Sequence, residues 1–309
     1  MSTNEFTTVR NINSWKELVE VESQYAEPTE EWVFRGESRE WDPPLQSTLE
    51  RLEQPAAGAA WSRSALEIQF FNDFKRSFRI HTPIEVSQAT NDDVLYWLSL
   101  MRHFGTPTRL VDFSYSLFIA TFFALEGQRK EDAVVWLISK TWLTRYNVKQ
   151  MMTHDGEAFC IDWGDRKPSA FRRIFWDPAT PYTGAFPVNP DAHHQRLHLQ
   201  QGLFLCPVRA EESFEDNLKA YSGWQQKVLK LRIKPDIREE MLLKLHRAGT
   251  NHELLFPGLD GFAQGLQSKT PVIQSNLLKL SASGARVATD QQGRFEWQKY
   301  YDAYCKHLP

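Results

Sequence analysis

Two neighbouring apolar segments near the middle of the chain constrain its fold more than any other feature. Residues 115–126 predict a helix that is too hydrophobic all round for a surface position, and residues 133–139 (AVVWLIS) predict a buried strand. The apolar run in the first segment is about half as long as a helix that crosses a bilayer. Both segments are therefore expected in the core of a water-soluble protein.

Strands and helices are expected along the whole chain. The other predicted strands share apolar residues bounded by polar residues, glycine or proline, and they cover residues 31–36, 201–208, 227–234 and 251–256. The other predicted helices share apolar residues at helical spacing, and they cover residues 10–27, 64–79, 91–103, 237–248 and about 295–307. Residues 150–190 show no clear periodicity and are predicted to form a loop or insertion. Because the late strands are not joined by regular βαβ units, we expect an α+β fold, with mixed or antiparallel sheets surrounded by helices.

At 309 residues the chain is long enough for one large domain or two ordinary ones, so its length does not settle the number of domains. The 36 Lys plus Arg residues against 39 Asp plus Glu give a net charge of −3, which argues against binding to nucleic acid or membrane by bulk charge. A local basic groove remains compatible with this balance. The three cysteines form no CxxC pair and the amino terminus lacks signal-peptide features, so we expect a reducing cytoplasm and no metal site.

The first candidate site is a strand that carries an arginine. Arg35 lies among apolar residues in the segment WVFRG, where a guanidinium is costly to bury without a partner. Its fork of donors fits a diphosphate or a carboxylate bidentately, and Gly36 would let a ligand approach the backbone. A structural Arg–Asp pair beside a turn glycine explains the same pattern, so both interpretations stay open.

The second candidate site follows a predicted helix end, in the segment RHFGTPTRLVD at residues 102–112. Arg109 precedes Asp112 by three residues, a spacing that allows an internal ion pair to fix the loop. His103 fits a general base, a ligand or a hydrogen-bonded core histidine.

Two later segments add an amide pair and a carboxylate. Gln200 and Gln201 precede a predicted strand, where such amides read a base or carboxamide edge or, more often, cap a turn. Glu253 is expected at a strand edge, where a partly desolvated carboxylate suits a catalytic acid, a base or a cation stabiliser. His252 and Glu253 lack the further partner that metal-binding motifs require.

Four motifs together resemble one protein family. The segments WVFRGES…LQSTLER, RHFGTPTRLVDFS…ATFFAL, QQGLFL and HELLFPGLDGFA are similar to successive motifs of FRG-domain proteins, named for a Phe/Tyr-Arg-Gly signature. The resemblance spans about residues 15–265, and HFGxPTRLxD is its most specific part. It implies a single domain, residues 1–309, with a core at about 15–265 and a helical tail at 266–309. The family occurs in bacterial and phage-encoded mobile loci. This occurrence implies a toxin-like or phage-defence role and leaves room for an antitoxin partner.

A more distant resemblance implies a mechanism. An aromatic-Arg-Gly strand, a downstream Ser-Thr pair and a late carboxylate are similar to the R-S-E layout of ADP-ribosyltransferases, whose core fold is then expected here. The resemblance assigns Arg35 to the NAD phosphates, Ser47 and Thr48 to support of the NAD site, and Glu253 to the reacting ribose. His103 corresponds to the histidine of the alternative H-Y-E arrangement.

These resemblances imply an enzyme that transfers ADP-ribose from NAD, as co-substrate, to RNA, DNA or protein. Cleavage of the nicotinamide–ribose bond develops positive charge on the anomeric carbon, which Glu253 would stabilise while Arg35 and Arg109 anchor the diphosphate. Gln201 joins the expected cofactor-binding residues, together with the Gly36 backbone. The acceptor needs a base, for which Glu253 or His103 is suited.

Two other functions fit the same residues. In the first, a non-catalytic module holds single-stranded RNA through arginines such as Arg102 and Arg109, and the aromatic content of 13% supplies stacking. In the second, a metal-dependent nuclease uses Asp112, Glu253 and His103. The transferase is preferred because it needs neither a basic excess nor several clustered acids.

Overall fold

The computed structural model describes residues 8–26, 28–52, 62–82, 92–126, 130–190 and 195–268. Its contacts divide the chain into two compact units, Met1–Arg238 and Glu239–Pro309, which we describe separately. The first unit contains a mixed sheet with helices around it, so the α+β fold class is confirmed. None of the described helices has the length and apolar character needed to cross a membrane.

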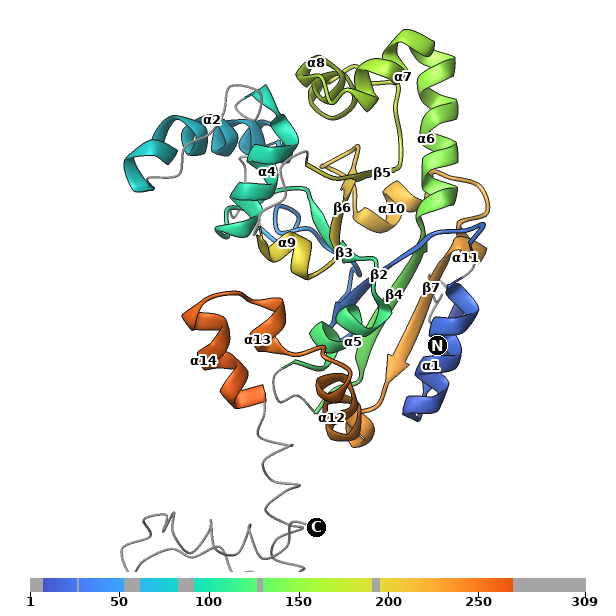
Figure 1. Ribbon diagram of the computed structural model, residues 1–309. Coiled ribbons are helices and arrows are strands. Elements are labelled where there is room, and N and C mark those ends of the chain that lie inside the picture. The colour runs from blue at the N-terminus through green and yellow to red at the C-terminus, as the bar shows by residue number, and fades with distance from the viewer. Residues whose placement is uncertain are drawn as a thin grey trace, which may run out of the picture. The chain divides into compact units, whose positions relative to one another are not determined.

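The strands of the first unit form one sheet. Their bounds are β1 Thr8–Ile12, β2 Trp32–Glu37, β3 Val111–Ser114, β4 Ala133–Ser139, β5 Ala185–Val188, β6 Gly202–Pro207 and β7 Val228–Ile233. Their order in the sheet is β1-β7-β4-β2-β3-β6-β5 (Figure 1). Neighbouring strands are antiparallel except β1 and β7, which run parallel. The predicted strands at 31–36, 133–139, 201–208 and 227–234 are confirmed.

The position of β2 within the sheet creates an opening. All residues of β4 are buried, as its apolar sequence predicts, and β2 pairs with β4 along its full length. On its other side β2 pairs with β3 at one position, Phe34 with Ser114. Beyond this pair the ladder between β2 and β3 stops. Past this pair, the backbone N–H and C=O groups on the facing edges of β2 and β3 must therefore form hydrogen bonds with other groups.

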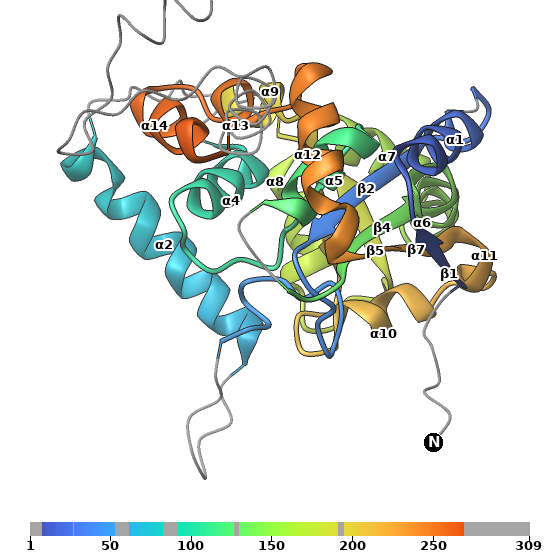
Figure 2. The same ribbon diagram turned by 90° about the horizontal axis from the view of Figure 1, so that it is seen from below.

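The helices of the first unit carry apolar residues toward the sheet or toward each other. Their bounds are α1 Trp15–Tyr25, α2 Arg63–His81, α4 Val94–His103, α5 Leu117–Leu125, α6 Lys140–His154, α7 Glu157–Gly164, α8 Pro168–Phe171, α9 Gln195–Leu199, α10 Phe214–Lys219 and α11 Trp224–Lys227. A π-helix, η1, covers Arg172–Trp176, and a 3-10 helix, η2, covers Pro235–Ile237. Figures 1 and 2 both show α5 lying against β2, and α2 beside α4.

Two hydrophobic clusters share strand β6. Phe204 and Cys206 pack with α2, α4 and η1, whereas Leu203 and Leu205 pack with β4, α6 and α10. Successive residues of a strand point to opposite faces, so β6 is buried on both sides. The helices predicted at residues 64–79, 91–103 and 115–126 are confirmed with small shifts of their ends. The helix predicted at 10–27 begins only at Trp15, because residues Thr8–Ile12 form strand β1 instead.

Residues 150–190 do not form the predicted loop. They contain the end of α6, the short helices α7 and α8, the π-helix η1 and strand β5. Phe171, Phe175 and Phe186 place their rings in the cluster that also contains α2 and α4. The short elements and the wider turn of a π-helix leave no sustained helical period, which is why the pattern was missed.

The second unit is helical where it is described. Helix α12, Arg238–Arg247, crosses the division between the units and confirms the helix predicted at 237–248. It is followed by α13 His252–Leu255 and α14 Leu259–Ser268. The strand predicted at 251–256 is wrong, because the Asn251 side chain accepts from Leu254 N at 3.2 Å and caps a helical turn instead.

Two predictions about the carboxyl-terminal part stay untested. The helix predicted at about 295–307 lies outside the described residues. The single domain with a core at 15–265 and a tail at 266–309 likewise stays a prediction.

Candidate functional site

A cleft of about 370 Å³ lies where the ladder between β2 and β3 stops. Its lining comes from both strands, the loop after β2, and helices α4, α5 and α9. Four arginines are among the described residues that line it: Arg35, Arg51, Arg102 and Arg196. The lining also includes two carboxylates, Glu37 and Asp112. Positive charge therefore exceeds negative charge in the cleft, which favours an anionic ligand.

Arg35 bridges the two separating strands. Its Nη1 donates to the backbone oxygen of Asp112 at 2.9 Å, and its Nε donates to Oε1 of Glu37 at 3.2 Å. The first bond occupies a carbonyl of β3 beyond the single residue pair that joins β3 to β2. The Arg35 side chain keeps 13% of its surface exposed, and it faces the cleft. The sequence allowed two interpretations of Arg35, a ligand-binding residue or a member of an internal ion pair. Arg35 pairs with Glu37 and also reaches the cleft, so it has features of both.

The Asp112 carboxylate holds a second guanidinium at the cleft. Arg102 donates to its Oδ2 through Nε at 3.0 Å and through Nη2 at 2.6 Å, and Arg35 Nη1 lies 3.8 Å from the same oxygen. Burial alone would raise the pKa of Asp112, but Arg102 and Arg35 outweigh it and lower that pKa from its ordinary value. Asp112 is therefore an ionised counter-charge that keeps two guanidinium groups in the cleft.

Two further arginines, Arg51 and Arg196, are partly buried in the cleft beside other guanidinium groups. Burial lowers the pKa of Arg51, and the neighbouring Arg35 guanidinium adds to that shift. Burial also lowers the pKa of Arg196, where Asp112 opposes the shift and Arg102 adds to it. Like charges that crowd together in a partly desolvated space disfavour each other. An anion bound among these groups would remove part of that repulsion.

His103 ends helix α4 and lines the same cleft. Burial lowers the pKa of His103 from its ordinary value, and the Arg196 guanidinium adds to the effect. The imidazole is therefore mainly neutral near pH 7 and able to accept a proton.

The comparisons with known proteins identify one domain. The model of the FRG domain matches residues 30–133. The chain contains an FRG domain. The match begins just before β2 and ends at the start of β4, so it includes Arg35, Arg51, Arg102 and Asp112 but not Arg196. No curated protein and no solved structure matches the chain.

The glycine of the FRG signature has a packing role in this domain. A Cβ atom at Gly36 would lie 1.9 Å from the backbone oxygen of Ala120 and 2.6 Å from the backbone nitrogen of Ala124, both in α5. Only glycine lets α5 approach β2 this closely. Gly36 lines the cleft, but α5 occupies the space where its side chain would lie, so that space is not available to a ligand.

Ser47 and Thr48 support the FRG domain away from the cleft lining. Ser47 Oγ accepts from Glu50 N at 3.0 Å. Thr48 Oγ1 accepts from Thr108 N and donates to Thr108 O, both at 3.2 Å. These bonds fix the loop that carries Arg51, so their link to the cleft is indirect.

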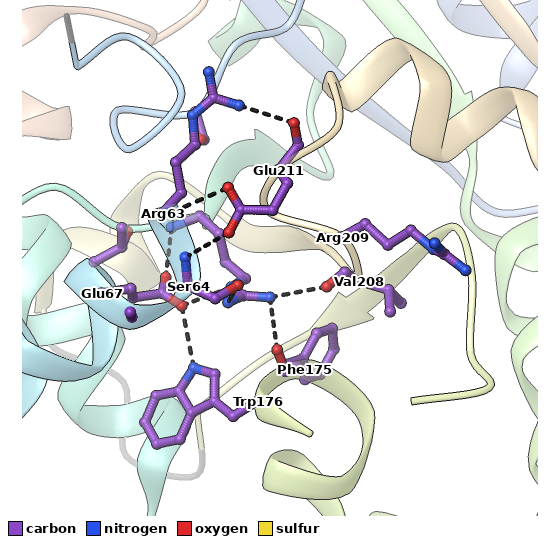
Figure 3. Close-up of polar contacts among 12 residues, drawn as sticks. Arg63, Ser64, Glu67, Phe175, Trp176, Val208, Arg209 and Glu211 are labelled. Carbon is purple, nitrogen blue, oxygen red and sulfur yellow. Dashed lines mark hydrogen bonds and ion pairs between the residues drawn. The ribbon is translucent and has the colours of Figure 1, made fainter. Parts of the chain in front are cut away.

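Arg109 lies in the core of the FRG domain and not in the cleft. It is fully buried, and its Nε donates to Oε2 of Glu67 at 2.6 Å. Its Nη1 donates to the carbonyl oxygens of Phe175 and Val208 at 3.0 and 2.9 Å, two of the contacts drawn in Figure 3. The predicted pair of Arg109 with Asp112 is wrong, because Glu67 neutralises Arg109 and its donors are already used.

The two glutamines before β6 lie in different places. Gln200 lines the cleft, whereas Gln201, predicted to bind cofactor, lines a separate cavity beside Tyr115. The backbone oxygen of Gln201 accepts from Tyr115 N at 2.9 Å, and its φ of 46° marks a tight turn. Gln201 is thus a turn residue, as amides at such positions often are.

Glu253 belongs to the second unit. It lies in the first turn of α13 and is exposed, so the predicted strand edge does not exist there. The neighbouring His252 is buried, stacks on Phe256 with ring centroids 4.1 Å apart, and has Nδ1 3.3 Å from Gly261 O.

The sequence did not single out three charged residues of the cleft, namely Glu37, Arg51 and Arg196. Glu37 follows Arg35 by two residues in one strand, so the period of a strand places both on one face. Arg51 ends the LQSTLER motif and was available to the same reasoning. Nothing in the sequence around Arg196 distinguishes it. Within the described part of the chain, no three His, Cys, Asp or Glu side chains are grouped to hold a metal ion.

Proposed function

We propose that the cleft binds the diphosphate of NAD and that the chain is an ADP-ribosyltransferase which modifies a macromolecule. The observation that carries this proposal is the grouping of Arg51, Arg102 and Arg196 around Arg35. Guanidinium groups bind phosphate oxygens bidentately, and each charged hydrogen bond contributes roughly 1.5–3 kcal/mol. A diphosphate supplies enough oxygens for more than one of these groups.

The chemistry follows from where charge develops. Departure of nicotinamide leaves positive charge on the anomeric carbon of the ribose, and a carboxylate near that sugar favours the transition state. In our proposal Arg35 fixes the diphosphate. His103, mainly neutral because burial lowers its pKa, takes the proton of the attacking acceptor. The leaving nicotinamide is neutral and needs no general acid.

The biological role in this proposal is that of a toxin-like or antiphage effector. The acceptor is RNA, DNA or protein, and an antitoxin would neutralise the enzyme. The FRG domain at residues 30–133 supports this role through the resemblance that the sequence carries.

A second candidate function has one observation in its favour. Trp41 lines the cleft, with the Arg39 guanidinium 3.7 Å and the Arg51 guanidinium 5.0 Å from its ring centroid. An indole beside cations is a common platform for nucleobases, so a non-catalytic RNA-binding module also fits.

The deciding experiment measures nicotinamide release from labelled NAD, with cell extract as the source of acceptor. We expect release by the wild type and by Arg232→Gln, and at least a hundredfold less by Arg35→Gln, which removes the diphosphate anchor. Arg232 is a matched control because it also lies on a strand and pairs with a glutamate, Glu40 at 3.0 Å, outside the cleft lining. Glu253→Gln tests, in the same assay, the ribose-stabilising role that the sequence resemblance assigns to Glu253.

The RNA alternative is read in parallel from retention of a labelled single-stranded oligonucleotide. If no protein releases nicotinamide while the wild type retains RNA and Trp41→Ala does not, the transferase proposal fails and the binding module replaces it.

A further inference from the structure

We infer that Glu37 is a positioning residue, which holds Arg35 and Arg51 in the arrangement that grips a diphosphate. This inference rests on the proposed NAD site and adds a role for Glu37, a residue of the WVFRGES motif to which the sequence assigned none.

The two oxygens of Glu37 have different partners. Oε2 accepts from Nε1 of Trp136 at 3.0 Å, and Trp136 is itself buried in β4. Oε1 accepts from Arg35 Nε at 3.2 Å and lies 4.0 Å from Arg51 Nη2. The Glu37 side chain is only 2% exposed. One oxygen thus anchors the carboxylate to the sheet, and the other faces two guanidinium groups of the cleft.

Glu37 contacts Arg35 and Arg51, and both arginines keep N–H donors that a ligand in the cleft can use. Among the described residues, Nη2 of Arg35 has no hydrogen-bond partner. Arg51 has a cation–π contact with Trp41 and a distant ion pair with Glu37, and 35% of its side chain is exposed. These donors point to an anion with several oxygens as the missing partner.

Glu37 also offsets the repulsion between the two arginines. Arg35 and Arg51 carry like charges close enough for Arg35 to lower the pKa of Arg51. A carboxylate between them makes their proximity tolerable, and its anchored geometry fixes their separation. The separation in turn sets where a diphosphate sits and where the bond to nicotinamide lies, because misplacement by about 1 Å can cost a hundredfold in rate.

Matched substitutions separate geometry from charge. Glu37→Asp keeps the charge and withdraws the carboxylate by one methylene, whereas Glu37→Gln keeps the length and removes the charge. Glu40→Asp and Glu40→Gln are the controls, because Glu40 lies three residues further on, pairs with Lys230 and Arg232, and is not among the residues that line the cleft.

The first measurement is calorimetric titration with inorganic pyrophosphate, which needs no turnover. We expect Glu37→Asp to raise the Kd about tenfold, the loss of about one charged hydrogen bond, and Glu40→Asp to stay within about twofold of the wild type. Thermal unfolding shows that each variant is folded. A Glu37→Asp protein that is folded and binds pyrophosphate like the wild type overturns the inference, whether or not NAD is the substrate.

The second measurement is the rate of nicotinamide release. We expect kcat to fall about a hundredfold in Glu37→Asp and in Glu37→Gln, with a smaller change in KM, since the groups remain present but are misplaced. A merely structural role would lower the amount of folded protein and leave kcat per folded molecule unchanged. A wild type that releases no nicotinamide refutes the proposed function, while the pyrophosphate titration still decides the role of Glu37.

Arg51→Gln covers the case in which both Glu37 variants fail to fold. Arg51 is partly exposed, so its loss is tolerated more easily. If both guanidinium groups grip the diphosphate, Arg51→Gln raises the pyrophosphate Kd about tenfold. An unchanged Kd contradicts the shared grip.

Discussion

Two arginines of the same domain show what separates a binding group from a structural one. Arg109 and Arg35 each donate to a glutamate and to a backbone carbonyl. The Arg109 side chain is 1% exposed and its partner Glu67 is 0% exposed, whereas Arg35 keeps 13% of its surface in a cleft that holds three more arginines. An ion pair alone therefore does not decide the role of an arginine. Remaining donors and access to solvent decide it.

The difference has a local cause in the sheet. Arg109 is enclosed by α2, η1 and the end of β6. The Glu67 carboxylate and the carbonyl oxygens of Phe175 and Val208 accept its hydrogen bonds. Arg35 lies where β2 and β3 stop pairing, so the space beside it is not filled by a strand. The core arginine stabilises the fold, and the cleft arginine is available for a ligand.

The strongest test of this contrast compares two alanine variants in urea unfolding. Arg109→Ala leaves Glu67 buried without its counter-charge, which is expected to lower the free energy of unfolding by about 3–5 kcal/mol. Arg35→Ala leaves Glu37 with its Trp136 bond and with Arg51 nearby, so we expect a loss of only about 1–2 kcal/mol. Equal losses for the two variants would erase the distinction drawn between core and cleft.

A smaller effect is expected from the glycine beside Arg35. Gly36→Ala drives a Cβ into the backbone of α5, and we expect a loss of about 1–3 kcal/mol in the free energy of unfolding. The cleft arginines are unchanged, so the pyrophosphate Kd of the folded protein should stay within about twofold of the wild type. Gly105→Ala is the control: nothing lies within 4 Å of its added Cβ, although its φ of +85° also carries strain. A stable Gly36→Ala protein with lost pyrophosphate binding would instead support the ligand-approach interpretation.

The sequence predicted the strands and helices of the first unit better than it predicted the cleft. Continuous apolar runs and helical spacing depend on burial, which is why β4 and α5 were found. The same rules predicted no structure for residues 150–190, because short elements and a π-helix interrupt the period. Asn251 turned the expected last strand into a helix by capping it, a local effect that outweighed the apolar run Leu254–Phe256.

The candidate site was predicted only in part, because the sequence cannot show which charges pair. Arg35, Gly36 and His103 do line one cleft. Arg109 looked equivalent to Arg35, yet its counter-charge, Glu67, comes from a helix 42 residues earlier in the chain. Arg196 enters the cleft from α9, far along the chain from β2. Pairing across such distances depends on the topology of the sheet, which spacing along the chain does not encode.

The smallest effect expected is on the pH dependence of stability, and it comes from His103 in the cleft. Burial and Arg196 lower the pKa of His103 in the folded protein below its ordinary value, so between the two values the unfolded chain binds more protons. His103 therefore costs stability as the pH falls below about 6.5, the pKa of an unperturbed histidine. His103→Gln should lessen the loss of stability between about pH 7 and pH 5, measured by urea unfolding at each pH. If His103→Gln and the wild type lose stability in parallel, the imidazole is not held neutral by the cleft. It would then lose its support as the base that accepts the proton of the incoming nucleophile.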